Sequence, residues 1–63
     1  MSRAEIKAAY KQVITGMITQ SQLEPLDYDI HYEIAHLIDK YKEDRDIIIE
    51  VKDELIGPRG WNL

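Results

Sequence analysis

Glu33 and His36 are the two side chains with the spacing of a metal site. They stand three residues apart, like the Glu-x-x-His pair of di-iron carboxylate bundles, which must project into the core. A helix turns about 100° per residue, which places His36 about 120° from the apolar line that starts at Ile30. His31 is five residues from His36, whereas a pair that shares a metal on one helix face needs four. With no glutamate on the apolar stripe of the first helix to complete a ligand shell, we expect no metal and no cofactor.

Nucleophilic catalysis has no candidate residue. The chain has no cysteine, which excludes thiol catalysis, disulfides and thiolate zinc sites and points to a reducing, cytoplasmic setting. Ser2 and Ser21 are better explained as helix caps. Gly57 and Gly60 do not form a glycine-rich, phosphate-binding turn between a strand and a helix. The sequence therefore predicts that the protein is not an enzyme.

Three aromatic residues are candidate contacts for a partner protein. Tyr28 and Tyr32 lie one helical turn apart on the side opposite the apolar line, with Ala35 beneath them. Tyrosine offers contact area at little cost in side-chain entropy, and Trp61, the only tryptophan, is a third candidate anchor. The alternatives are that the two tyrosines pack on the C-terminal tail and that Trp61 covers the end of a small core.

Carboxylates repeat at intervals of four and three residues on the same predicted face. They are Asp39, Glu43, Asp46, Glu50 and Asp53. Like charges four residues apart oppose helix formation by a few tenths of a kcal/mol per pair, so this acidic stripe has a local cost. We expect it to steer the protein onto a basic protein surface. The alternative is an ordinary solvated face, because neighbouring lysines dilute the field.

Charge is divided unevenly along the 63 residues, whose net charge is −4. Residues 1–20 hold three cations, Arg3, Lys7 and Lys11, against Glu5, whereas residues 21–56 hold four cations against eleven carboxylates. An acidic body disfavours a phosphate backbone as a partner, so nucleic acid is an unlikely ligand. No apolar run approaches the ~20 residues of a membrane span, and we expect no membrane contact.

Helices must position these residues. Ser2 and Glu5 have the spacing of a capping box, and apolar residues then recur at three and four, which predicts a helix over residues 3–20. Pro25 marks a connection at residues 21–27, and Asp27 is the expected cap of the next helix. Gly57-Pro58 is a strong stop. Within roughly 40° of one helical line lie Ile30, Ile34, Leu37, Tyr41, Ile48 and Leu55.

Residues 28–56 form either one helix or two. The apolar line keeps its phase throughout, which favours one helix, but it is interrupted at Asp44 and Arg45. One long helix would leave Ile48, Val51 and Leu55 uncovered, so a second copy would have to cover them. We predict an all-α fold, an antiparallel helical hairpin that dimerises into a four-helix bundle. The alternative is a monomeric three-helix bundle broken near residues 43–46.

In length and hairpin layout the chain resembles the repressor-of-primer family, whose members are RNA-binding dimers that form a four-helix bundle. The resemblance implies a dimer, whereas the acidic outer face contradicts an RNA-binding role. The capped first helix and the Gly57-Pro58 ending with an aromatic residue are also similar to small phage head–tail joining proteins. Those proteins carry a β-hairpin between their helices, and no segment here predicts one. We therefore assign the chain to neither family.

The predicted organisation is one helical domain at residues 1–57 and a short tail at residues 58–63. We expect a small acidic protein–protein interaction module, most concretely an inhibitor or adaptor that binds a basic surface. One alternative is a homo-oligomeric assembly element that uses residues 47–55 as its contact. A weaker alternative is a nucleic-acid-binding hairpin that uses the cations of the first helix.

Overall fold

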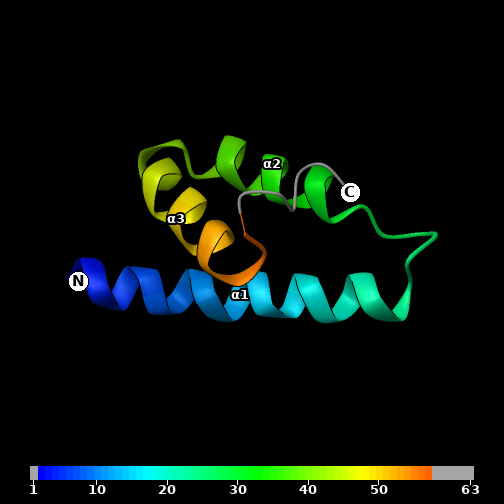
Figure 1. Ribbon diagram of the computed structural model, residues 1–63. Coiled ribbons are helices and arrows are strands. Elements are labelled where there is room, and N and C mark those ends of the chain that lie inside the picture. Colours follow the sequence, from blue (N-terminus) through cyan, green and yellow to red (C-terminus); the bar gives the residue numbers. More distant parts are fainter. Residues whose placement is uncertain (1, 58–63) are drawn as a thin grey trace.

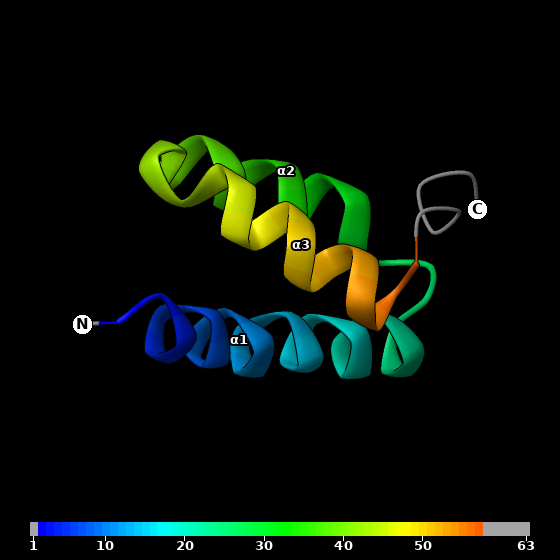
Figure 2. The ribbon, with the colours of Figure 1, turned by 60° about the vertical axis from the view of Figure 1, so that its left-hand side comes forward.

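Three α-helices form the fold in the computed structural model, which describes residues 2–57 (Figure 1). They are α1 (Arg3–Leu23), α2 (Ile30–Lys40) and α3 (Arg45–Leu55), with a short 3-10 turn, η1 (Lys42–Asp44), between the last two. No strand occurs in the described residues, so the all-α prediction is confirmed. α2 and α3 run in opposite directions as a hairpin above α1, and α3 is the nearer of the two to α1 in Figure 2.

The helix α1 begins at the predicted cap. The backbone N–H of Glu5 donates to the Ser2 hydroxyl at 3.2 Å, and that hydroxyl donates to the Glu5 carboxylate at 3.3 Å. The helix runs past its expected end at Gln20 and continues to Leu23, with no break at Gly16. Because α1 is about 31 Å long at 1.5 Å per residue, it is nearly twice the length of either other helix.

Asp29, rather than the expected Asp27, caps α2. One of its carboxylate oxygens accepts hydrogen bonds from the amides of His31 and Tyr32, at 3.0 and 3.2 Å. The amides of Asp27 and Tyr28 instead donate to the carbonyl of Glu24, which closes a turn before the helix. The prediction of Asp27 as the cap is therefore wrong, because that residue belongs to the turn after Pro25.

Residues 28–56 form two helices, so the single long helix of the predicted hairpin is wrong and the three-helix alternative describes the structure. α2 ends where Tyr41 leaves helical geometry, and the chain reverses through η1. The polar run Lys42–Asp46 has nothing to bury, whereas the isoleucines after it do. Reversal gives up a few backbone hydrogen bonds worth about 0.5–1.5 kcal/mol each. It buries several aliphatic side chains worth about 1.5–3 kcal/mol each, which is the larger gain.

The core joins all three helices. Ile14 of α1, Ile34 of α2, and Ile48 and Val51 of α3 are fully buried. Tyr10 and Ile47 are nearly so, and Ile30, Leu37 and Leu55 pack against this cluster. Ile48 and Val51 are thus covered within one chain without a second copy, and the dimer stays a prediction.

Candidate protein-binding groove

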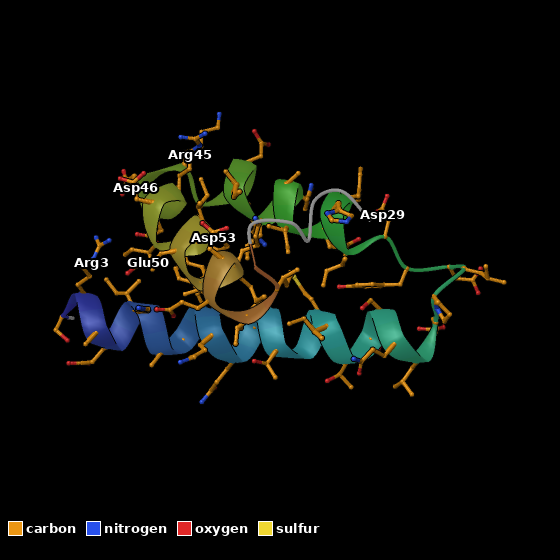
Figure 3. All side chains as sticks on the ribbon, viewed as in Figure 1. Arg3, Asp29, Arg45, Asp46, Glu50 and Asp53 are labelled. Atoms are coloured by element: carbon orange, nitrogen blue, oxygen red, sulfur yellow. The ribbon has the colours of Figure 1, made fainter. Side chains whose placement is uncertain are left out.

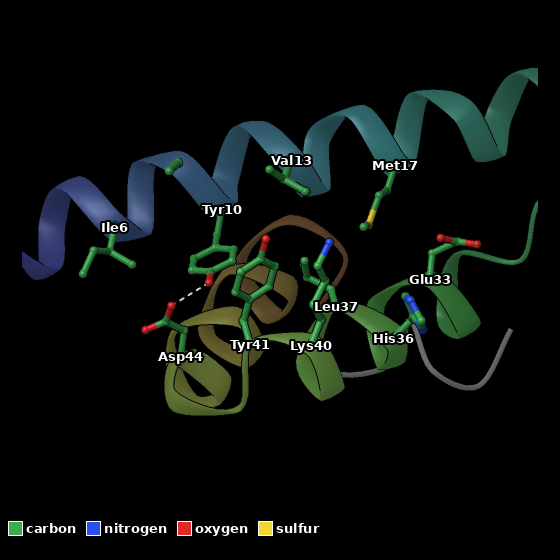
Figure 4. Close-up of a pocket in the computed structure, with 11 residues that line it drawn as sticks. Ile6, Tyr10, Val13, Met17, Glu33, His36, Leu37, Lys40, Tyr41 and Asp44 are labelled. Carbon is green, nitrogen blue, oxygen red and sulfur yellow. Dashed lines mark hydrogen bonds between the residues drawn. The ribbon is translucent and has the colours of Figure 1, made fainter.

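An apolar groove of about 580 Å³ runs between α1 and α2, on the side of the bundle that α3 does not fill (Figure 4). Its floor and walls are mostly aliphatic and aromatic. Val13 and Tyr41 are 45% and 43% exposed there, although the sequence pattern places both in the core. The groove is lined from α1 by Ile6, Ala9, Tyr10, Val13 and Met17, and from α2 and the turn by Glu33, His36, Leu37, Lys40, Tyr41 and Asp44.

A hydrogen bond closes one end of this α1–α2 groove. The Tyr10 hydroxyl donates to the Asp44 carboxylate at 2.6 Å, which ties the turn between α2 and α3 to α1. Burial, together with the adjacent Asp44 carboxylate, raises the pKa of Tyr10 to about 12. The rings of Tyr10 and Tyr41 meet edge to face with centroids 6.1 Å apart, and this geometry favours aromatic contact. This end of the groove is therefore held by three residues from α1 and the α2–α3 turn.

Charged side chains lie along the α2 wall of the groove. The Lys40 ammonium lies 5.6 Å from the centroid of the Tyr41 ring, which is within the range of a cation–π contact. Glu33 lies at the end opposite Asp44, as Figure 4 shows, and makes no salt bridge among residues 2–57. The lining thus carries two carboxylates and one lysine.

The cations of α1 point away from this groove. The guanidinium of Arg3 lies 3.3 Å from the Glu50 carboxylate (Figure 3), and the Lys7 ammonium lies 3.3 Å from Glu50 and 2.8 Å from Glu54. The hydrogen bond from Lys7 to Glu54 is the main reason why the pKa of Lys7 is raised, and the same hydrogen bond lowers the pKa of Glu54. These α1–α3 ion pairs are exposed, so each contributes little to stability. Their larger consequence is that two of the three cations of α1, Arg3 and Lys7, are matched by carboxylates within the chain.

The structure does not bring the predicted tyrosine pair together on a helix. Tyr28 lies in the turn before the cap Asp29 and is half-buried, whereas Tyr32 lies on α2 and is 64% exposed. Burial raises the pKa of Tyr28. Tyr32 instead stacks on His36, with ring centroids 6.2 Å apart and planes 12° from parallel. Since His36 lines the groove, Tyr32 belongs to its rim, and Tyr28 does not.

The predicted acidic stripe is not a single row. Asp39 lies on α2 and Glu43 in η1, and the reversal of the chain separates both from the carboxylates of α3. On α3, Glu50 is engaged by Arg3 and Lys7, and Asp53 accepts a hydrogen bond from the buried Lys52 at 2.8 Å. Asp46 is exposed. A regular line of charge along one helix face is therefore excluded, because it required one continuous helix.

Other candidate features add no chemistry to the groove. Trp61 lies outside the described residues. Across residues 2–57, no three side chains of the metal-binding types gather as a possible metal site. Over that same range, no helix combines the length and the apolarity needed to cross a membrane.

The sequence contained a signal for the groove that periodicity alone did not resolve. From Val13 to Ile18 the apolar residues of α1 cover about 140° of the helix surface, which is more than the ≳100° stripe that one packing face needs. In the structure α3 covers the side that carries Ile14, and Val13 faces the groove. Comparisons of the chain with protein-family models, with curated proteins and with solved structures found no match.

Proposed function

We propose that the protein is a protein-binding module, an inhibitor or adaptor, whose contact surface is the α1–α2 groove and its rim. The observation that carries this proposal is the groove itself. A 63-residue chain needs its apolar side chains for the core, yet Val13 and Tyr41 remain almost half exposed in one hollow. Exposed apolar surface rimmed by polar residues is typical of an interaction site.

The surroundings of the groove suit such a contact. Interfaces are enriched in tyrosine and methionine, and the groove and its rim supply Tyr32, Tyr41 and Met17. Two carboxylates in the lining itself, Glu33 and Asp44, favour approach by a basic partner.

Two observations favour the groove over the two alternative functions. The assembly element required residues 47–55 as its contact, and Ile47, Ile48 and Val51 are buried against the rest of the bundle. The nucleic-acid-binding hairpin required free cations on α1, and two of the three are paired with carboxylates of α3.

The test compares the wild type with Val13→Glu and with Thr15→Glu, which adds the same charge on the exposed far side of α1. Each immobilised protein is incubated with a lysate of the organism that makes it, and the bound proteins are quantified by mass spectrometry. We expect at least one protein that the wild type and Thr15→Glu retain equally and that Val13→Glu loses. If every protein held by the wild type is also held by Val13→Glu, the groove is not the contact surface.

A further inference from the structure

We infer that the groove takes an amphipathic α-helix of a partner protein, with basic residues at both ends of the apolar stripe of that helix. The partner helix lies along α1 as the fourth helix of a bundle. This inference rests on the proposed function and gives its partner a chemical class. The shape, the charge and the lack of a suitable helix in a second copy each support it.

The shape of the groove fits a helix. Its α1 wall extends from Ile6 to Met17, a length of about 16 Å at the helical rise of 1.5 Å per residue. Three turns of a partner helix cover that length, with apolar anchors at positions i, i+3 or i+4, and i+7. Both walls of the groove are themselves helical, and a fourth helix between them would complete the packing that the three helices leave open (Figure 4).

The charges of the groove select basic ends. Asp44 and Glu33 stand at its two ends, and the single lysine, Lys40, lies between them (Figure 4). Glu33 is half-buried and without a salt bridge among residues 2–57, so an incoming cation there would gain a partner. The α1 wall adds no cation to the lining. Two of the three cations of α1, Arg3 and Lys7, are engaged by α3. Positive residues at both ends of a docked helix would therefore meet carboxylates.

Within residues 2–57, neither α2 nor α3 of a second copy has a free apolar face to place in the groove. The apolar faces of α2 and α3 are buried in the core or already line the groove. The outward face of α3 carries acidic residues, Asp46 and Asp53, and two copies would each bring a net charge of −4. Docking of the outward face of α3 in the groove would thus bring carboxylates towards Glu33 and Asp44, and specific interfaces avoid such like-charge contacts.

The experiment uses two labelled peptides of about 14 residues, with leucines at helical spacing and either lysines or glutamates at both ends. Binding to the full chain is followed by fluorescence anisotropy. We expect the lysine-ended peptide to bind at least about tenfold more tightly than the glutamate-ended one. Glu33→Gln should weaken binding of the lysine-ended peptide roughly two- to fivefold. Glu24→Gln, in the turn far from the groove, should leave the affinity for this peptide unchanged.

Val13→Glu separates docking from simple attraction of opposite net charges. The substitution makes the protein more acidic, so unspecific attraction of the basic peptide would increase, whereas docking in the groove would fall at least about tenfold. Thr15→Glu adds the same charge elsewhere and should not weaken binding. Circular dichroism verifies that both variants fold. If Val13→Glu fails to fold, the peptide binding of Glu33→Gln gives a second test.

Three results would overturn the inference. They are equal affinity for the two peptides, undiminished binding to Val13→Glu, and a concentration-dependent dimer in sedimentation equilibrium that Val13→Glu abolishes. The last result would place a second copy in the groove. A partner from the lysate that depends on Val13 but does not select basic peptides would keep the proposed function and refute only the basic helix.

Discussion

The hydrogen bond from Tyr10 to Asp44 should be the strongest single polar contribution to this fold. Tyr10→Phe removes only the hydroxyl and keeps the ring against Tyr41. A hydrogen bond to a charged group contributes about 1.5–3 kcal/mol. Because Asp44 is only half-buried and can regain water, we expect the lower end, about 1.5 kcal/mol. A chain of 63 residues has a total stability of about 3–9 kcal/mol, so this loss is a substantial share of it.

Urea unfolding followed by circular dichroism measures the effect. With a slope of about 1 kcal/mol/M for so small a protein, the midpoint should fall by roughly 1.5 M. Tyr32→Phe is the matched control, since the Tyr32 side chain is 64% exposed, and it should leave the midpoint within the error. A double-mutant cycle with Asp44→Ala should give a coupling energy of about 1 kcal/mol or more. If both tyrosine variants unfold alike and the coupling is near zero, Tyr10 does not hold the α2–α3 turn on α1.

Three further predictions follow from the same structure. The free energy of unfolding should fall as the pH rises from about 10 towards 12. The cause is that the unfolded chain releases the Tyr10 proton near pH 10.0, whereas the folded chain keeps it until about pH 12. In thermal melts, Tyr10→Phe should lose less stability than the wild type over this pH range. Ile48→Ala should lower the free energy of unfolding by about 2–5 kcal/mol, because Ile48 is fully buried. Leu26 is 97% exposed, so Leu26→Ala should change it by less than about 0.5 kcal/mol. Equal effects of the two variants in urea titrations would contradict the assigned core. Asp29→Ala should cost about 0.5–2 kcal/mol and Asp27→Ala much less, and the reverse order in thermal melts would restore Asp27 as the cap of α2.

Local signals in the sequence were sufficient for much of the secondary structure. The Ser2–Glu5 cap and the apolar repeat at Ile6 and Tyr10 depend only on residues within one or two turns, and both appear in α1. The sequence did not decide whether a break separates α2 from α3, because no glycine or proline marks that position. The cause of the break is tertiary, since the reversal packs the isoleucines of α3 into the core. It also brings Asp44 to Tyr10, which lies 34 positions away in the sequence.

The groove was harder to predict than the helices. A helical wheel identifies Val13 and Tyr41 as apolar-face residues, but it does not show whether a neighbour covers them. Whether Val13 is covered depends on how far α3 extends along α1. The position of the chain reversal between α2 and α3 determines that extent. Likewise, the buried Lys52 sits among carboxylates that appeared to form a solvated face, and only the packing of α3 reveals its burial.

The unfilled side of the bundle also has a consequence for how long the protein survives. A ligand that binds only the folded state adds free energy of unfolding by mass action, about 2.7 kcal/mol when it is present at 100 times its dissociation constant. Against a total of about 3–9 kcal/mol for a chain of this length, occupancy of the groove would lower the unfolded fraction by about two orders of magnitude. Proteases that act on the unfolded chain would then remove the solitary protein much faster than the bound one. With the partner proposed for the groove, the amount of this protein would thus follow the amount of that partner.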